Sequence, residues 1–206
     1  AQMSRGKSEK TIAFAMSSVA ATLAKFSMDV CLYMSQNFDF ITLPAHLTTG
    51  SSIMPHKKNP DIFELVRARC NRIQGLPNEL ILLTNNLPSG YHRDLQLTKE
   101  ILFPAIDSLK ECLEILIYTL PNIEVKDNIL DDEKYKYIFS VEKINEEVKN
   151  GKSFRDAYIQ IGQEIEKELF EYDYKELNHS HQGSLGNLCL DEIEYQFNKV
   201  RDKLLG

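Results

Sequence analysis

One long stretch without proline or glycine, residues 8–37, constrains the fold more than any other feature of the chain. Apolar residues recur along it at alternating spacings of four and three, at Ile12, Met16, Val19, Leu23, Phe26, Val30 and Tyr33. This spacing is typical of one face of a helix in a bundle with coiled-coil-like packing. Alanines make other faces small and apolar as well, at Ala13, Ala15, Ala20, Ala21 and Ala24. The stretch therefore predicts a long helix that is buried among other helices.

Proline and glycine divide the next part of the chain. A helix is expected over 59–84, because Asn59 suits the N-cap and Pro60 suits the first helical position. Gly75 and Pro77 should kink or interrupt this helix. The segment that precedes it is expected to be irregular.

Shorter and more charged helices are expected after Pro121. The remaining predicted helices lie at about 95–120, 131–150, 153–170 and 189–204. No segment alternates as a strand does, so the predicted fold class is all-α. We expect a long-helix bundle at 1–122, forming part of a central helical domain, and a small C-terminal helical domain at 123–206. Few segments match the length of 8–37, which suggests that part of the bundle lies outside this chain or in other subunits.

Composition and charge exclude several classes of function. The net charge of −6 argues against a nucleic-acid partner. No apolar run is expected to reach the ~20 residues that cross a bilayer, so no membrane partner is predicted. The cysteines are widely spaced without a CxxC pair, at Cys31, Cys70, Cys112 and Cys189. Neither a zinc site nor a disulfide framework is expected, and free thiols in a reducing, cytoplasmic compartment are the simplest interpretation.

Two histidine features carry little weight. His179 and His181 have no cysteine or carboxylate beside them in the sequence, so we expect a solvated connector there rather than a metal site. His56 stands alone and is expected at the surface or at the edge of a pocket.

The segment 50–61 combines groups that can hold a small dicarboxylate. Removing a proton beside a carboxylate needs a positioned base and a means to stabilise the negative charge that develops. Lys57 supplies positive charge, and the Asn59 amide donates hydrogen bonds. The free N–H groups of the helix start add a favourable dipole. Ser51 can act as the base only if this field lowers its pKa strongly, and Gly50 gives the loop its conformational freedom.

A structural interpretation of the same segment remains open. A Gly-Ser-Ser turn before a capped helix is common, and a nearby lysine is usually a solvated charge. A P-loop is excluded, because GxxxxGK[ST] is absent.

The full motif resembles the signature of the fumarase/aspartase superfamily. It comprises Gly50-Ser51-Ser52-Ile53-Met54-Pro55, Lys57 and Asn59, followed by Glu64. Members of this superfamily break C–N or C–O bonds and release fumarate. Lys57-Lys58-Asn59-Pro60-Asp61 is similar to the argininosuccinate lyase family, and so is the second element, Gly90 to Glu100, which matches GYxxDLQxxKE. His56 stands where that family usually has glutamine. In this one position the motif resembles adenylosuccinate lyase instead.

This resemblance implies the elimination of fumarate from argininosuccinate to give arginine, without metal or organic cofactor. Ser51 would be the general base, Lys57 and Asn59 would hold the succinate carboxylates, and Glu64 would orient a catalytic histidine. The implied catalytic residues are Ser51, Lys57, Asn59 and Glu64, and the implied substrate-binding residues are Ser52, Tyr91, Gln96 and Lys99. Adenylosuccinate lyase, and a helical structural protein that has lost catalysis, are the alternatives.

The resemblance also implies an incomplete enzyme. The family's catalytic-acid histidine lies in earlier motifs that are not in this sequence, so the chain is expected to be a C-terminal fragment. In the family, three subunits of a homotetramer build each active site. We therefore expect the full protein to form a tetramer and the 206-residue chain by itself to be inactive.

Overall fold

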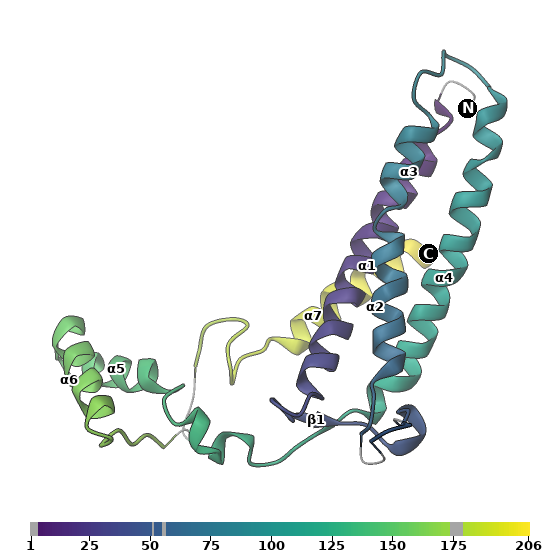
Figure 1. Cartoon of the computed structure of the whole chain (residues 1–206). Coiled ribbons are helices and arrows are strands. Elements are labelled where there is room, and N and C mark those ends of the chain that lie inside the picture. The colour runs from purple at the N-terminus through teal and green to yellow at the C-terminus, as the bar shows by residue number, and fades with distance from the viewer. Residues whose placement is uncertain (1–3, 51, 55–56, 174–178) are drawn as a thin grey trace. The chain divides into compact units, whose positions relative to one another are not determined.

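The computed structural model describes residues 4–50, 52–54, 57–173 and 179–206. The chain divides into two compact units, Ala1–Ile129 and Leu130–Gly206 (Figure 1). This division lies a few residues after the predicted boundary at 122. The assignment of the two parts to domains of a larger protein stays a prediction.

The first unit is a bundle of helices built around α1. The helices are α1 (Lys7–Tyr33), α2 (Asp61–Ile73), α3 (Leu76–Leu83) and α4 (Thr98–Thr119). They run side by side along the bundle, with α2 and α3 following one another in line (Figure 1). Long helices thus dominate the unit, and the all-α prediction is confirmed.

Helix α1 buries the face that carries mostly small side chains. Most of its buried residues are small, and the set is Ala13, Met16, Ala20, Ala24, Ser27 and Val30. Small side chains let the backbones of α1 and α2 approach closely. Ile12, Val19 and Tyr33 of the predicted apolar seam are exposed instead. The long helix is therefore confirmed, but the prediction that the 12–33 seam is buried is wrong for these three positions within this chain.

The start of α1 depends on a glycine. Gly6 has φ +85°, a left-handed conformation that glycine adopts without strain. A Cβ atom at this position would lie 3.2 Å from the Cγ2 atom of Thr84, so the chain passes close to the end of α3 here. The Gly6 N–H donates to the Glu9 carboxylate at 2.8 Å, which satisfies a free donor near the first turn.

Helix α2 begins one residue later than the sequence predicts. Pro60 is the N-cap, without a side-chain cap hydrogen bond, and Asp61 is the first helical residue. The prediction that Asn59 caps the helix is wrong because the Asn59 backbone pairs with Thr49 instead. The predicted break is confirmed, since α2 ends at Ile73 and α3 starts at Leu76.

Short elements close both ends of the bundle. Helix α4 starts at Thr98 rather than near 95, after the 3-10 turn η3 (Arg93–Gln96), and it contains Pro104. Strands β1 (Ile41–Thr42) and β2 (Glu124–Val125) form a two-residue antiparallel ladder that the sequence pattern did not predict. Further 3-10 turns in the described part of the chain are η2 (Ala45–Leu47), η4 (Leu120–Asn122) and η5 (Ile129–Asp131), and η6 (Glu133–Tyr135) lies in the second unit.

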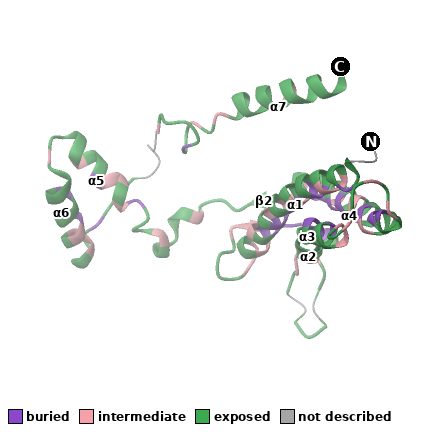
Figure 2. Cartoon of the chain, turned by 90° about the horizontal axis from the view of Figure 1, so that it is seen from above, coloured by how far each residue is buried: buried purple, intermediate pink, exposed green. Residues whose placement is uncertain are grey.

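The second unit has a much smaller core. Its helices are α5 (Ser140–Lys149), α6 (Phe154–Glu166) and α7 (Leu190–Leu205), of which α5 is much shorter than predicted. Helices α5 and α6 pack together around Ile144, Ala157, Ile161 and Phe170. Most of the ribbon in this unit is exposed, in contrast to the inner faces of the bundle (Figure 2).

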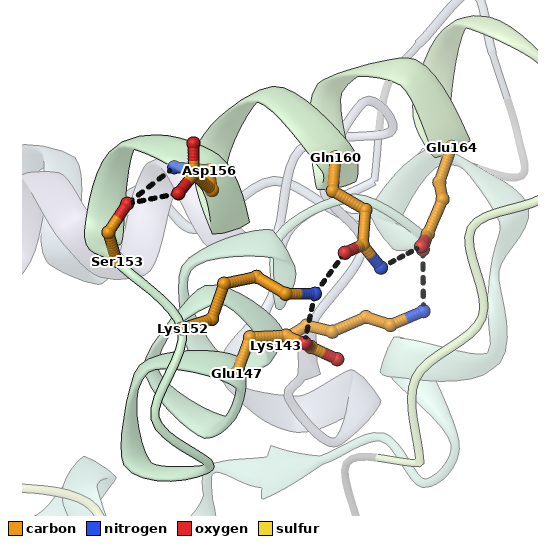
Figure 3. Close-up of polar contacts among 7 residues, drawn as sticks. All are labelled: Lys143, Glu147, Lys152, Ser153, Asp156, Gln160 and Glu164. Atoms are coloured by element: carbon orange, nitrogen blue, oxygen red, sulfur yellow. Dashed lines mark hydrogen bonds and ion pairs between the residues drawn. The ribbon is translucent and has the colours of Figure 1, made fainter.

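Polar contacts join α5 to α6 (Figure 3). Lys143 donates to the Glu164 carboxylate at 2.8 Å. The Gln160 amide donates to the same carboxylate at 2.8 Å. Lys152 donates to Glu147 at 2.6 Å and also to the side-chain oxygen of Gln160. These contacts form a connected network at the edge of the small apolar core.

Helix α1 passes a length and composition test for a membrane span. It does so alone among helices of the described residues, with a mean hydropathy of 1.3 over an 18-residue window. This corrects the expectation that no apolar run approaches that length. Core helices of water-soluble proteins pass the same test, and α1 packs against α2, α3 and α4 in the bundle.

Candidate active site

A cavity of about 630 Å³ lies where α1 ends and α2 begins. Three of the predicted catalytic residues line it together: Lys57, Asn59 and Glu64. Ser51 and His56 lie outside the described residues, so the structure does not place them. Ser52, the neighbour of Ser51, is described and exposed.

Backbone pairing fixes the end of the loop onto the start of α2. The Asn59 N–H donates to the Thr49 carbonyl at 2.9 Å, and the Thr49 N–H donates back to the Asn59 carbonyl at 3.3 Å. The Thr49 hydroxyl donates to the Asp61 carboxylate, in the first turn of α2. The Lys57 N–H donates to the Met54 carbonyl at 3.0 Å. Lys57 and Asn59 are thereby held beside the helix start rather than on a free loop.

The cavity wall carries more positive than negative charge near the loop. Lys57, Lys58 and Lys126 line it, together with Asp39 and Glu64. Lys126 forms an ion pair with Asp39 at 2.5 Å. Within the described residues, neither Lys57 nor Lys58 forms an ion pair. Together with the dipole of α2, these two ammonium groups favour an anionic ligand such as a carboxylate.

Other lining residues were not found by sequence reasoning. Cys31 comes from the last turn of α1, and Lys126 follows β2. Burial raises the pKa of the Cys31 thiol, which Arg67 partly offsets. Lys126 reaches the cavity because β2 pairs with β1, more than eighty residues earlier in the chain, and local sequence patterns carry no signal for that pairing.

The second predicted group lies around the connection between α3 and α4. The Gln96 side-chain amide donates to the Tyr91 hydroxyl, so these two predicted residues are in contact. The Arg5 guanidinium lies 5.6 Å from the centre of the Tyr91 ring. Lys99 is exposed in the first turn of α4. This cluster is therefore at the end of the bundle where α1 begins.

The two predicted groups lie at opposite ends of the bundle (Figure 1). The cavity with Lys57 and Asn59 is beside the last turn of α1, whereas Tyr91 contacts Arg5, just before its first turn. Helix α1 has 27 residues, which at ~1.5 Å per residue separates the two ends by roughly 40 Å. One chain therefore does not bring Tyr91, Gln96 and Lys99 to the Lys57 cavity.

Comparison with known proteins decides the family. A family model described as "Lyase" matches residues 8–75. The chain is 55% identical over 97% of its length to an argininosuccinate lyase of Parabacteroides distasonis. It is 52% identical over 98% of its length to an argininosuccinate lyase of Bacteroides thetaiotaomicron. The chain belongs to this lyase family. It spans 45% of the length of each of these two relatives, so it corresponds to less than half of such a protein.

Solved structures of lower identity share the fold. A 3-carboxy-cis,cis-muconate lactonizing enzyme from Pseudomonas putida superposes with a TM-score of 0.66 at 19% identity, covering 80% of this chain and 38% of that one. A class II fumarase from Schistosoma mansoni gives a TM-score of 0.60 at 20% identity, covering 80% of this chain and 36% of that one. At these identities the likeness concerns the fold, and it agrees with the helical bundle of this lyase-family chain.

Proposed function

We propose that this chain is part of an argininosuccinate lyase, which eliminates fumarate from argininosuccinate and leaves arginine. The observation that carries the proposal is the shared cavity of Lys57, Asn59 and Glu64 at the start of α2. The 55% identity to an argininosuccinate lyase supports this choice of substrate.

In the proposed reaction, the cavity holds the succinyl part of the substrate. The Lys57 ammonium and the Asn59 amide bind its carboxylates and stabilise the charge that develops when the neighbouring carbon loses a proton. Ser51 takes that proton, in a field of positive charge that lowers the pKa of its hydroxyl. Glu64, in the first turn of α2, orients the group that protonates the leaving nitrogen. No metal or organic cofactor takes part.

The separation of the two predicted groups leads to a composite site. We propose that Tyr91, Gln96 and Lys99 of one copy complete the cavity that Lys57 and Asn59 line in another copy. A homotetramer supplies such pairings. The exposed apolar residues of α1 support contacts with other helices, because large apolar side chains such as Phe14 and Ile12 are about half exposed there.

The proposal is tested on the intact protein that contains this chain, by following fumarate absorbance. Lys57→Met should lower kcat at least about a hundredfold, because one preorganised charge at developing negative charge contributes on that order. Lys110→Met, on the exposed side of α4, is the matched control and should leave the rate unchanged. Equal rates for both variants would refute the role of Lys57. Turnover of adenylosuccinate in place of argininosuccinate would refute the substrate, and no turnover of either would favour a non-catalytic protein.

The composite site has its own test. Lys57→Met and Gln96→Ala copies should each be nearly inactive by themselves. After dissociation and reassembly together, some sites receive a native Lys57 cavity and a native Tyr91–Gln96 pair, so part of the activity should return. If mixed assemblies stay inactive although both variants fold, the two groups do not serve one site. The 206-residue chain by itself should release no fumarate.

A further inference from the structure

Helix α7, the last helix of the second unit, has an apolar face that the rest of this unit leaves exposed. None of its residues is buried, and all of them are described. Its five seam residues, Leu190, Ile193, Phe197, Val200 and Leu204, are each at least 59% exposed. Their spacing of three, four, three and four forms one stripe along the helix. The green ribbon of α7 in Figure 2 shows the same exposure.

The charged residues of α7 have mostly negative charge in its first half and mostly positive charge in its second half. Asp191, Glu192 and Glu194 lie in its first half. Lys199, Arg201 and Lys203 lie in its second half together with one acid, Asp202, which forms an ion pair with Arg201 at 2.9 Å and leaves that half with a net positive charge. Glu194 and Arg201 each follow a seam residue directly and flank the seam on the same side, two helical turns apart. They are the flanking positions that meet across a two-stranded helical interface.

Orientation decides whether these charges attract. In an antiparallel pair of identical helices, Glu194 of one copy faces Arg201 of the other, and the reverse contact forms as well. In a parallel pair, the acidic halves lie together and the basic halves lie together, which is unfavourable. The seam itself interleaves in the antiparallel sense, with Phe197 of one copy against Val200 of the other. The helix is therefore complementary in shape and charge to a second, reversed copy of itself.

We propose that α7 is a pairing surface, and that its partner is the α7 of a second copy of this chain in antiparallel orientation. An isolated helix of 16 residues is only marginally stable in water. Pairing covers the apolar stripe and forms two equivalent Glu194–Arg201 contacts. This inference does not depend on the proposed lyase activity, because it uses only the sequence and exposure of α7.

Charge exchange between two preparations of the full chain tests the pairing. Glu194→Lys copies have a basic group at both flanking positions and repel one another, and Arg201→Glu copies have an acid at both positions and do the same. Mixing the two preparations sets the new ammonium group of one copy against the new carboxylate of the other across the interface. A zero-length carbodiimide cross-linker joins an amine to a carboxylate only in direct contact. Isotope labelling of one preparation then identifies links between copies by mass spectrometry.

The matched control uses the outward face of α7. Glu192→Lys mixed with Lys199→Glu makes the same charge changes within the same helix, away from the seam. We expect the link between positions 194 and 201 to exceed the link between positions 192 and 199 at least about tenfold, with circular dichroism showing equal helix content in all variants. Equal yields, or links from α7 only to α5 and α6 of the same copy, would overturn the proposal.

Discussion

The two compact units are stabilised in different ways. The bundle unit has a continuous apolar cluster that draws on α1, α2, α3 and α4, including Phe63 and Leu80, which are fully buried. The second unit buries Ile144, Ala157, Ile161 and Phe170, and adds the polar network of Figure 3 around them. Partly exposed ion pairs contribute only about 0–1 kcal/mol each. The second unit therefore depends on a few apolar side chains far more than the bundle does.

Identical truncations should have unequal consequences in the two units. Phe63→Ala and Phe170→Ala each remove a fully buried ring, at a cost of about 3–5 kcal/mol. We expect Phe170→Ala to unfold the second unit, because its core is small, while Phe63→Ala leaves the bundle folded but weakened. Hydrogen exchange followed by mass spectrometry over 57–129 and 130–173 measures both. Phe154→Ala, at an exposed ring, is the control, and equal protection in both units would contradict this contrast.

Thiol reactivity should separate the same two units. Cys70 and Cys112 are buried together between α2 and α4, and burial raises the pKa of Cys70 to about 12. At neutral pH its thiolate fraction is roughly a thousandfold below that of a free thiol. We therefore expect alkylation of half-buried Cys189 in minutes, and of Cys70 only after the bundle unfolds. Rates at each site follow from peptide mass spectrometry, and fast labelling of Cys70 in the folded chain would show that the bundle core opens readily.

A serine-to-alanine change should strengthen the bundle. Ser27 is fully buried in α1, and its hydroxyl has no hydrogen-bond partner among the described residues. An unsatisfied buried hydroxyl costs about 1–3 kcal/mol, so Ser27→Ala should raise the free energy of unfolding by about 1 kcal/mol. Ser17→Ala, on the same helix, removes a hydroxyl that donates to the Gln74 carbonyl and should not stabilise. Thermal denaturation measures both, and a lower Tm for Ser27→Ala would show that a bound water satisfies the hydroxyl.

The smallest expected effect concerns acid stability of the second unit. Hydrogen bonds from Gln160 and Lys143 lower the pKa of Glu164 below its usual value. The carboxylate thus adds stability above the unfolded pKa of about 4.3, and this stability is lost as the pH falls through the lower folded value. Because the Glu164 side chain is partly exposed and solvent screens its pairing with Lys143, the effect should be at most about 0.5 kcal/mol. Lys143→Met should reduce the loss between pH 6 and pH 3 in denaturant titrations, whereas Lys149→Met should not.

Sequence patterns predicted the elements better than their contacts. The absence of proline and glycine from 8–37 predicted α1, and Gly75 predicted the break between α2 and α3. The capping pattern placed the start of α2 one residue early, because a backbone pair with Thr49 holds Asn59 outside the helix. The two-residue ladder of β1 and β2 was missed, since strands this short leave no periodic signal.

The candidate site likewise combines residues that the sequence predicted with residues that only the fold revealed. The motif singled out Lys57, Asn59 and Glu64, which the fold gathers in one cavity. Cys31 and Lys126 were not predicted as lining residues, because only packing between distant segments brings them there. Tyr91 and Gln96 were predicted to bind the substrate, and the length of the bundle keeps them away from that cavity in a single chain.

The sequence by itself determined that this chain forms long helices and that it carries a lyase-family loop before α2, because helix formation and loop chemistry are set by nearby residues. Only the tertiary structure decided that α1 buries Ala13, Ala20 and Ala24 and leaves Ile12 and Val19 exposed. A helix with several apolar faces can bury any of them, and the choice depends on the surface of its neighbours. The two predicted groups of site residues lie at opposite ends of the bundle because α2 and α3 follow one another in line between them.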